Sequence, residues 1–223
     1  MVAVIAIDGP AGSGKSVVSY ELAKRLGITY LDTGAIYRSL ALESLKQNIK
    51  SSNVIKLIEL ANNIKISFEN INKKQIILVN NVDVTNDIRT EKIGHLSSII
   101  GVHLGLREKL CFLQRKLCCK AKKWIIVEGR DIGTVVFPNA LVKIFLQASK
   151  EERANRRAIQ LGLSSYSDKN KILKNIIERD KRDMMRKFAP LKIAYDAKIV
   201  DTTDILLEDL INILESYIIM SLK

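Results

Sequence analysis

The chain has few of the residues that form loops, disulfide frameworks and stacking surfaces. Among its 223 residues are 3 prolines, 11 glycines and 3 cysteines, and aromatic residues make up only 5%. A hydrophobic content of 47% with so little proline and glycine argues against a disordered chain. The length allows a substantial core, and we expect one compact unit with an insertion rather than two equal domains.

Cysteine is too scarce and wrongly spaced for a disulfide framework. Cys111, Cys118 and Cys119 form no C-x-x-C pair, and their number is odd. On a helix, Cys111 and Cys118 lie on one face. We therefore expect buried thiols in a reducing cytosol.

Apolar runs long enough to cross a bilayer are also missing. The first one, VAVIAI, is too short, and no basic region with a cleavage site accompanies it. The apolar segment 205–220 is interrupted by Glu208, Asp209 and Glu215, as in a packed amphipathic helix. These features predict a soluble, cytoplasmic protein with no membrane partner.

Acidic residues are outnumbered, with 24 against 36 basic residues and a formal net charge of +12. Such an excess suggests an anionic partner, either nucleic acid or a small phosphorylated ligand. A nucleic-acid-binding protein usually adds aromatic stacking residues or an RNA-binding signature, and the sequence has neither. The two classes differ in the salt dependence of binding to heparin or DNA, which is steep for a nucleic-acid binder.

Short apolar runs alternate with longer helical patterns. This alternation predicts an α/β fold, a five-stranded parallel sheet with helices on both faces. The expected strands are 2–8, 28–32, 124–129, 142–148 and 197–202. The expected helices are 15–26, 34–48, 91–120, 150–161, 169–186 and 205–221.

Two segments interrupt this alternation. Residues 62–92 carry two β-branched runs joined by Asn-rich turns, which predicts a small inserted antiparallel meander. Residues 162–168, GLSSYSD, join two strongly charged helices and form a candidate mobile loop.

The stretch GPAGSGKSV, residues 9–17, matches the P-loop pattern between a strand and a helix. Its glycines let backbone N–H groups converge on phosphate oxygens at a helix N-terminus. Lys15 suits the β- and γ-phosphates, and the Ser16 hydroxyl suits Mg²⁺. The predicted ATP-binding residues are Gly9, Pro10, Ala11, Gly12, Ser13, Gly14, Lys15, Ser16 and Val17.

The P-loop alone does not choose the phosphate acceptor. A GTPase needs an Asn-Lys-x-Asp type motif, which does not occur. An ATPase that activates water is disfavoured because Glu128, at the end of a strand, is followed closely by Arg130 and Asp131. That crowding suits a phosphoryl acceptor better than water.

Four further stretches suit a second anionic substrate, and two of them follow strands, where open α/β sheets bind their ligands. They are YLDTGAIYR (30–38), SSIIGVHLGLRE (97–108), EGRDIGT (128–134) and RDKRDMMRKFAPL (179–191). Taken singly, Arg–Asp spacings like these are more often exposed ion pairs than ligand clamps.

Together with the P-loop, these stretches resemble the bacterial cytidylate kinases, which transfer a phosphoryl group from ATP to CMP or dCMP. The resemblance covers nearly the whole chain, and its most specific runs are DTGAIYR and GRDIGTVVFP. It implies that Arg38, Arg130 and Arg186 bind the acceptor phosphate and that Asp131 accepts a hydrogen bond from cytosine N4. It also implies that ATP and Mg²⁺ are required. The further acceptor contacts that it implies are Ser98 and Arg107 with the base, Arg179 and Asp183 with the sugar, and Thr33 with the acceptor.

Within this reading, the charges that act on the transferred phosphoryl group come from Lys15, Arg130 and Arg186, and from Arg153 and Arg157 on a lid helix. We expect a core domain of residues 1–61, 93–149 and 187–223, an acceptor-binding insertion of residues 62–92, and a lid with flanking helices of residues 150–186. The family resemblance implies a monomer. Alternatives are a P-loop kinase with UMP, AMP, dTMP or a non-nucleotide acceptor, or a nucleic-acid-binding protein switched by ATP.

Overall fold

The computed structural model describes residues 2–71, 74–119 and 121–221. The chain divides into two compact units, one formed by residues 1–31 and 118–223 and the other by residues 32–117. We name them the sheet unit and the inserted unit and describe each by itself. The predicted division into a core, an acceptor-binding insertion and a lid has other bounds and concerns binding and movement, so it stays a prediction.

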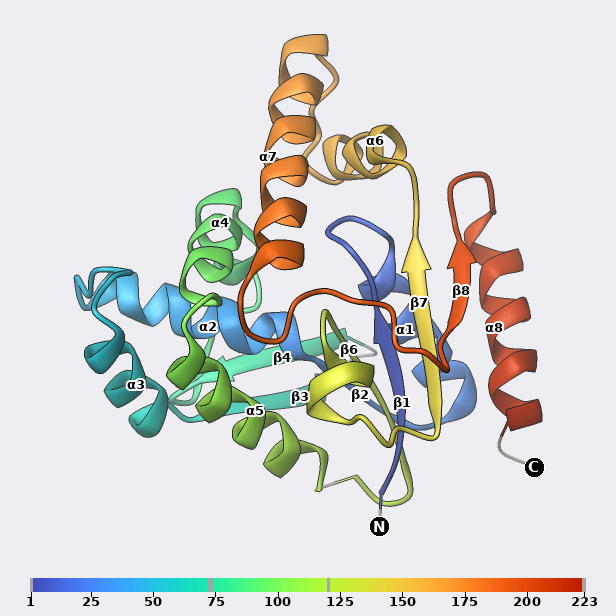
Figure 1. The fold of residues 1–223 in the computed structure, drawn as a ribbon, viewed down its shortest axis with the longest axis horizontal. Helices are drawn as coiled ribbons and strands as arrows, with labels where there is room; N and C mark the ends of the chain where they lie inside the picture. The colour runs from blue at the N-terminus through green and yellow to red at the C-terminus, as the bar shows by residue number, and fades with distance from the viewer. Residues whose placement is uncertain (1, 72–73, 120, 222–223) are drawn as a thin grey trace. The chain divides into compact units, whose positions relative to one another are not determined.

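A five-stranded sheet forms the centre of the sheet unit (Figure 1), in the order β2-β6-β1-β7-β8. The central strand β1 pairs in parallel with β6 and β7, and Ile5 lies opposite both Ile126 and Val142. Strands buried on both faces explain the nearly continuous apolar runs of the sequence. The strands are β1 (Ala3–Asp8), β2 (Thr29–Asp32), β6 (Trp124–Gly129), β7 (Val142–Gln147) and β8 (Lys198–Asp201), as predicted.

Helices α1 (Lys15–Leu26) and α8 (Leu207–Ser221) pack against this sheet in one hydrophobic core. Leu22 of α1 and Leu214 of α8 are fully buried there beside Ile7 of β1. The α/β architecture and the amphipathic C-terminal helix are therefore confirmed.

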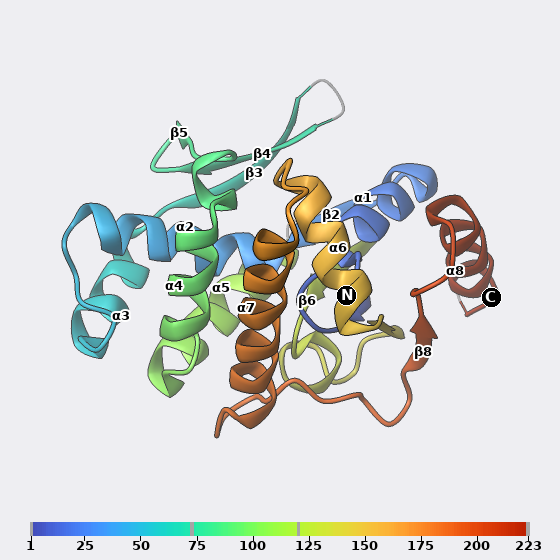
Figure 2. The same ribbon diagram turned by 90° about the horizontal axis from the view of Figure 1, so that it is seen from above.

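Helices α6 (Lys150–Gln160) and α7 (Tyr166–Met185) form a helical hairpin with its own small core of Ala154, Ala158, Ile172 and Ile176. Figure 2 shows the two helices side by side. The predicted loop 162–168 is too long, because Ser165 caps α7 by accepting from the backbone N–H of Asp168, and the helix begins at Tyr166. The mobility of the remaining loop stays a prediction.

The inserted unit combines helices with a three-stranded antiparallel sheet, in which Ile66 lies opposite Val79. The meander predicted within residues 62–92 is confirmed. The elements are α2 (Thr33–Lys46), α3 (Val54–Asn63), β3 (Ile66–Ile71), β4 (Lys74–Val79), β5 (Val82–Asp83), the 3₁₀-helix η1 (Asp87–Arg89), α4 (Glu91–Ile100) and α5 (Leu104–Cys118).

One helix prediction in this unit is wrong, and one helix was missed. The single helix expected over 91–120 is broken between α4 and α5 at residues 101–103, where the ring of His103 hydrogen-bonds the Ser51 carbonyl oxygen at 2.8 Å. Helix α3, capped by Asn53, was not predicted.

The cysteines are free thiols, with Cys118 buried, Cys111 half-buried and Cys119 exposed. Burial raises the pKa of the Cys118 thiol to about 12. Among the helices that the structure describes, none is both long and apolar enough to cross a membrane.

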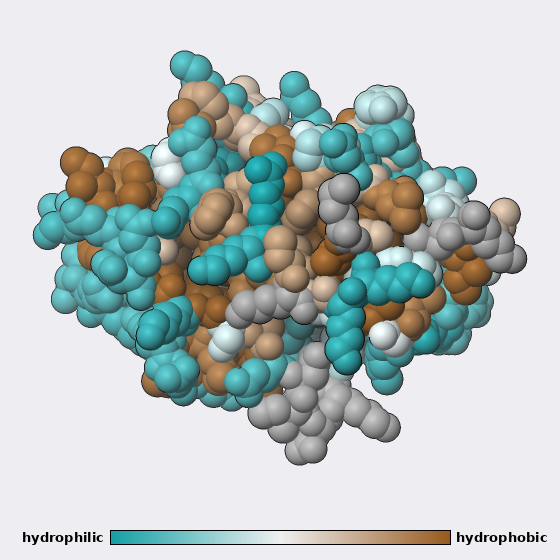
Figure 3. Space-filling model, turned by 90° about the horizontal axis from the view of Figure 1, so that it is seen from below, coloured by the Kyte–Doolittle hydropathy of each residue, from teal (hydrophilic) through white to brown (hydrophobic). Residues whose placement is uncertain are grey.

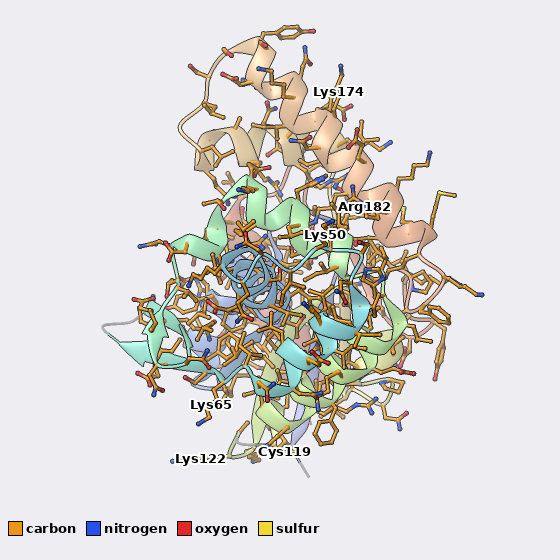
Figure 4. The ribbon with its side chains drawn as sticks, turned by 90° about the vertical axis from the view of Figure 1, so that its left-hand side faces the viewer. Lys50, Lys65, Cys119, Lys122, Lys174 and Arg182 are labelled. Carbon is orange, nitrogen blue, oxygen red and sulfur yellow. The ribbon has the colours of Figure 1, made fainter. Side chains whose placement is uncertain are left out.

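Hydrophobic and hydrophilic residues are interleaved on the face of the molecule seen in Figure 3. Exposed basic side chains come from separate segments of the chain, as Figure 4 shows for Lys50 and Lys65 of the inserted unit and for Lys122 and Lys174 of the sheet unit. The positive charge is therefore distributed over both units.

Candidate active site

The loop between β1 and α1 has a backbone that only glycine can supply at its first position. Gly9 has a φ of 153°, and a Cβ atom there would lie 2.0 Å from the carbonyl oxygen of Leu146 in β7. Gly12 and Gly14 also have positive φ values, and Gly14 immediately precedes α1. The loop therefore passes tightly over the sheet and turns into the N-terminus of α1, as a phosphate-binding loop must.

Lys15 is buried, and its side chain turns back across this loop. Its ammonium group donates to the Pro10 carbonyl oxygen at 2.6 Å and to the Ser13 hydroxyl at 3.2 Å. Burial and the nearby Arg130 lower the pKa of Lys15 well below its ordinary value, although Glu128 and Asp8 oppose this effect. The negative charge of a bound polyphosphate would favour the protonated form of this buried amine.

Arg130 and Asp131 lie between β6 and a short π-helical turn, η2 (Ile132–Val136). Asp8, the last residue of β1, holds the start of this turn, because its carboxylate accepts from the N–H groups of Ile132 at 2.9 Å and Gly133 at 2.7 Å. The strand that leads into the P-loop thus also positions the loop that carries Arg130 and Asp131.

The C-terminal end of α7 contacts Arg130 and Asp131. Arg130 donates through Nε to Asp183 at 3.1 Å, and Arg186 donates to Asp131 at 3.4 Å. Arg186 also lies 3.5 Å from the Asp183 carboxylate. Four of the predicted acceptor residues therefore form one ion-pair cluster within the sheet unit, which we name the acceptor cluster (Arg130, Asp131, Asp183 and Arg186).

Electrostatics keep Asp183 ionised in this cluster. Burial, the largest influence, by itself raises the pKa of Asp183, but the guanidinium groups of Arg130, Arg179 and Arg186 outweigh it and hold the pKa below its ordinary value. Arg186 ends α7 and donates to the carbonyl oxygen of Ala189, whose positive φ of 47° turns the chain back at this point.

The two arginines predicted to act from α6 have different surroundings. Arg153 is buried and bonded to Asp180 and to the Ala11 carbonyl oxygen of the P-loop. Arg157 is half-buried and donates to Gln160 at 3.2 Å on its own helix. Arg156, between them, bonds Glu152 and the Thr202 hydroxyl.

The remaining predicted acceptor residues lie in the inserted unit. Thr33 and Ser98 are buried, and Arg107 donates to the Gly101 carbonyl oxygen at 2.9 Å and stacks over the Tyr37 ring at 5.4 Å. Arg38 lies on α2, close enough to Asp32 to lower the pKa of that carboxyl group.

Asp32 organises the start of α2. It caps the helix by accepting from the Ala35 N–H at 3.0 Å and pairs with Arg89 of η1 at 3.1 Å. Burial, the largest influence, by itself raises the pKa of Asp32, but Arg89 and Arg38 outweigh it and hold the pKa below its ordinary value.

The comparisons with known proteins agree with these motifs. The family model described as cytidylate kinase matches residues 5–219. The chain belongs to the cytidylate kinase family. It is 44% identical to a cytidylate kinase of Citrifermentans bemidjiense over 214 residues, covering 96% of this chain and 91% of that protein.

A cytidylate kinase of Pasteurella multocida is also 44% identical, over 96% of this chain and 94% of that protein. A solved structure of an uncharacterized protein from Eubacterium ventriosum superposes with a TM-score of 0.51 at 14% identity and covers 98% of each chain, which supports the fold alone.

The sequence patterns of this cytidylate kinase family member did not single out Asp8, Arg89 or Asp180. Each is an acidic or basic residue whose partner is distant in sequence, 169 residues away for Asp180 and Ala11. Only the position of Asp8 at the end of the strand before the P-loop gave a local signal.

The residues present fit an ATP–Mg²⁺ complex. Buried Lys15 lies across a loop that contains three glycines with positive φ values, and the exposed Ser16 is the second residue of α1. Among the described residues no group of three or more His, Cys, Asp or Glu side chains could hold a metal ion. The Ser16 hydroxyl has the chemistry of a Mg²⁺ ligand.

Proposed function

We propose that this protein transfers the γ-phosphoryl group of ATP to CMP or dCMP and yields ADP with CDP or dCDP. The observation that carries this proposal is the cluster of Arg130, Arg186, Asp131 and Asp183 in the same compact unit as the P-loop lysine. Membership of the cytidylate kinase family supports the same reaction.

The P-loop residues 9–17 would hold the ATP phosphates through their backbone N–H groups. Lys15 would exchange its internal bonds to Pro10 and Ser13 for phosphate oxygens, which are stronger acceptors because they are charged. When bound, Mg²⁺ neutralises phosphate charge and orients the transferred group.

Arg38, Arg130 and Arg186 would bind the acceptor phosphate. Arg130 and Arg186 are held by Asp183 and Asp131, so their guanidinium groups are positioned before the substrate arrives. Phosphoryl transfer depends mainly on positioning and charge neutralisation, so no side-chain nucleophile is needed.

Cytosine offers an amino donor at N4, and we assign the Asp131 carboxylate to accept from it. Uracil has a carbonyl oxygen at that place and would face the carboxylate with lone pairs, an arrangement that costs about 1–3 kcal/mol. Ser98 and Arg107 would contact the rest of the base, Arg179 and Asp183 the sugar, and Thr33 the acceptor.

Further charge over the phosphates would come from Arg157 on α6. Arg153 would first have to leave Asp180 and the Ala11 carbonyl oxygen, two buried interactions, before it could reach ATP. We therefore prefer Arg157 for the direct role. Movement of residues 62–92 and 150–186 around the substrates, a monomeric state and a cytoplasmic location complete the proposal.

The proposal is tested by assaying transfer from ATP–Mg²⁺ to CMP with the wild type and with Lys15→Ala and Arg186→Ala. Lys15→Ala should lower kcat at least about a hundredfold, because it removes a charge that stabilises the transition state. Arg186→Ala should raise the KM for CMP about tenfold or more and leave the KM for ATP within about threefold, since its partners belong to the acceptor cluster. Equal loss of affinity for both substrates in Arg186→Ala would contradict its assignment.

A further inference from the structure

A buried ion pair joins the two helices of the α6–α7 hairpin. The guanidinium group of Arg153 lies 2.6 Å from the Asp180 carboxylate, and the two side chains are only 4% and 7% exposed. Asp180 has no part in the reaction proposed above.

Both members of this pair also bind the backbone of one P-loop residue. The N–H of Ala11 donates to Asp180 Oδ1 at 3.2 Å, and Arg153 donates to the Ala11 carbonyl oxygen at 2.8 Å. Arg153 further donates through Nε to the Ala148 carbonyl oxygen, which follows β7. Both polar groups of the Ala11 backbone are thus satisfied by the same ion pair.

Gly12, the next P-loop residue, packs closely against Arg153. A Cβ atom at Gly12 would lie 3.1 Å from the Cβ of Arg153. The loop therefore rests against the first turn of α6, and its backbone cannot shift there without breaking charge-assisted hydrogen bonds.

The turn of α7 that carries Asp180 also carries two predicted acceptor residues. Arg179 is the preceding residue, and Asp183, three residues later, pairs with Arg130. A single helical turn thus contacts both the P-loop and the acceptor cluster.

We propose that Asp180 is a positioning residue that, with Arg153, fixes the P-loop backbone at Ala11 in its nucleotide-binding conformation and ties it to the turn of α7 that carries Arg179 and Asp183. Part of the ATP affinity then depends on a carboxylate that touches no nucleotide. This inference rests on the proposed function only in requiring that a nucleotide occupies the P-loop.

The test compares Asp180→Ala, Asp180→Asn and Arg153→Lys with Glu178→Gln, a matched control on an exposed position of the same helix. ATP binding is measured by titration calorimetry at a temperature well below each variant's Tm, and the KM values for ATP and CMP are measured on the same samples. Asp180→Ala should weaken ATP binding about tenfold or more, because the hydrogen bonds that Asp180 accepts from the Ala11 N–H and from Arg153 are both lost.

Asp180→Asn keeps an oxygen that can accept from the Ala11 N–H but loses the ion pair, so its affinity for ATP should lie between those of the wild type and Asp180→Ala. Arg153→Lys should also be intermediate, and Glu178→Gln should match the wild type. The KM for CMP should change less than the KM for ATP in each of the Asp180 and Arg153 variants.

Unchanged ATP affinity in folded Asp180→Asn and Arg153→Lys, with only Tm lowered, would overturn the positioning role and leave a purely structural pair. The calorimetric readout separates this inference from the proposed reaction. Failure of the wild type to phosphorylate CMP while it binds ATP would refute the reaction and leave the Asp180 result interpretable.

Discussion

Asp8 shows how a single carboxylate can serve the site at a cost to stability. Burial is the largest influence on it and raises its pKa from 3.8 to about 6, even though it accepts hydrogen bonds from Gly133 and Ile132. The ionised form is the one that can accept both bonds that hold η2. Folding therefore places a carboxylate where ionisation is unfavourable, in order to fix the loop that carries Arg130 and Asp131.

This placement predicts a pH dependence of stability. Because the pKa of Asp8 is higher in the folded state, its contribution to stability is complete below about pH 4 and is lost as the pH rises through about 6. Relative to Asp8→Asn, which does not titrate, the wild type should lose up to about 3 kcal/mol of unfolding free energy over this range. Urea unfolding at several pH values measures the difference.

Asp204→Asn, at an exposed position, is the matched control for removing one carboxylate. A constant difference between Asp8→Asn and the wild type from pH 4 to pH 7 would show that the Asp8 carboxylate titrates alike in both states, contrary to the geometry.

At this scale the sequence could predict the residues whose spacing is itself the signal. Lys15 and Ser16 follow from the P-loop pattern, and Arg130, Asp131 and Arg186 follow from the family motifs. Asp180 and Asp8 could not be assigned roles, because those roles depend on contacts with Ala11 and Gly133, which the fold alone brings near.

At the scale of elements, the five strands were predictable because each is a short, nearly continuous apolar run. All six predicted helices start within three residues of an observed helix start. Helix α3 was missed although Leu57, Leu60 and Ala61 are buried at helical spacing, since the segment is short and lies beside the predicted meander. The break after α4 was missed because it depends on the contact between His103 and Ser51, which are far apart in sequence.

The P-loop gives a prediction at this scale, through its packing on β7. Gly9→Ala places a methyl group against the Leu146 carbonyl oxygen, so the loop must move away from the sheet. ATP affinity should fall about tenfold or more, because the loop N–H groups no longer converge on the phosphates. Titration calorimetry with ATP provides the measurement.

Gly27→Ala is the matched control, because Gly27 ends α1 with a φ of 65° but has nothing within 4 Å of an added Cβ. It should lower the unfolding free energy by about 1 kcal/mol through backbone strain alone and leave ATP affinity unchanged. If both variants lost ATP affinity equally, general strain rather than the contact with Leu146 would be responsible.

At the scale of the whole molecule, the chain's net charge of +12 has two sources that the sequence could not separate. Arg130, Arg179 and Arg186 surround Asp183 in the acceptor cluster. Exposed lysines such as Lys50, Lys122 and Lys174 lie in separate segments of the chain (Figure 4). A basic composition alone suggested nucleic acid as well as nucleotides, whereas the arrangement of the arginines around buried carboxylates favours a small phosphorylated substrate.

The identity of the phosphoryl acceptor distinguishes the proposed reaction from that of a P-loop kinase that acts on another nucleotide. The most direct measurement is ATP–Mg²⁺ phosphoryl transfer to CMP, dCMP, UMP, AMP, GMP and dTMP, run in parallel on the wild type and on Asp131→Ala. We predict that the wild type strongly prefers CMP and dCMP and that Asp131→Ala loses most of this preference, since a missing base contact of this kind is worth about 1–3 kcal/mol. Activity spread evenly over the six acceptors, or a preference for CMP that survives in Asp131→Ala, would contradict the assignment of Asp131 as the residue that reads the base.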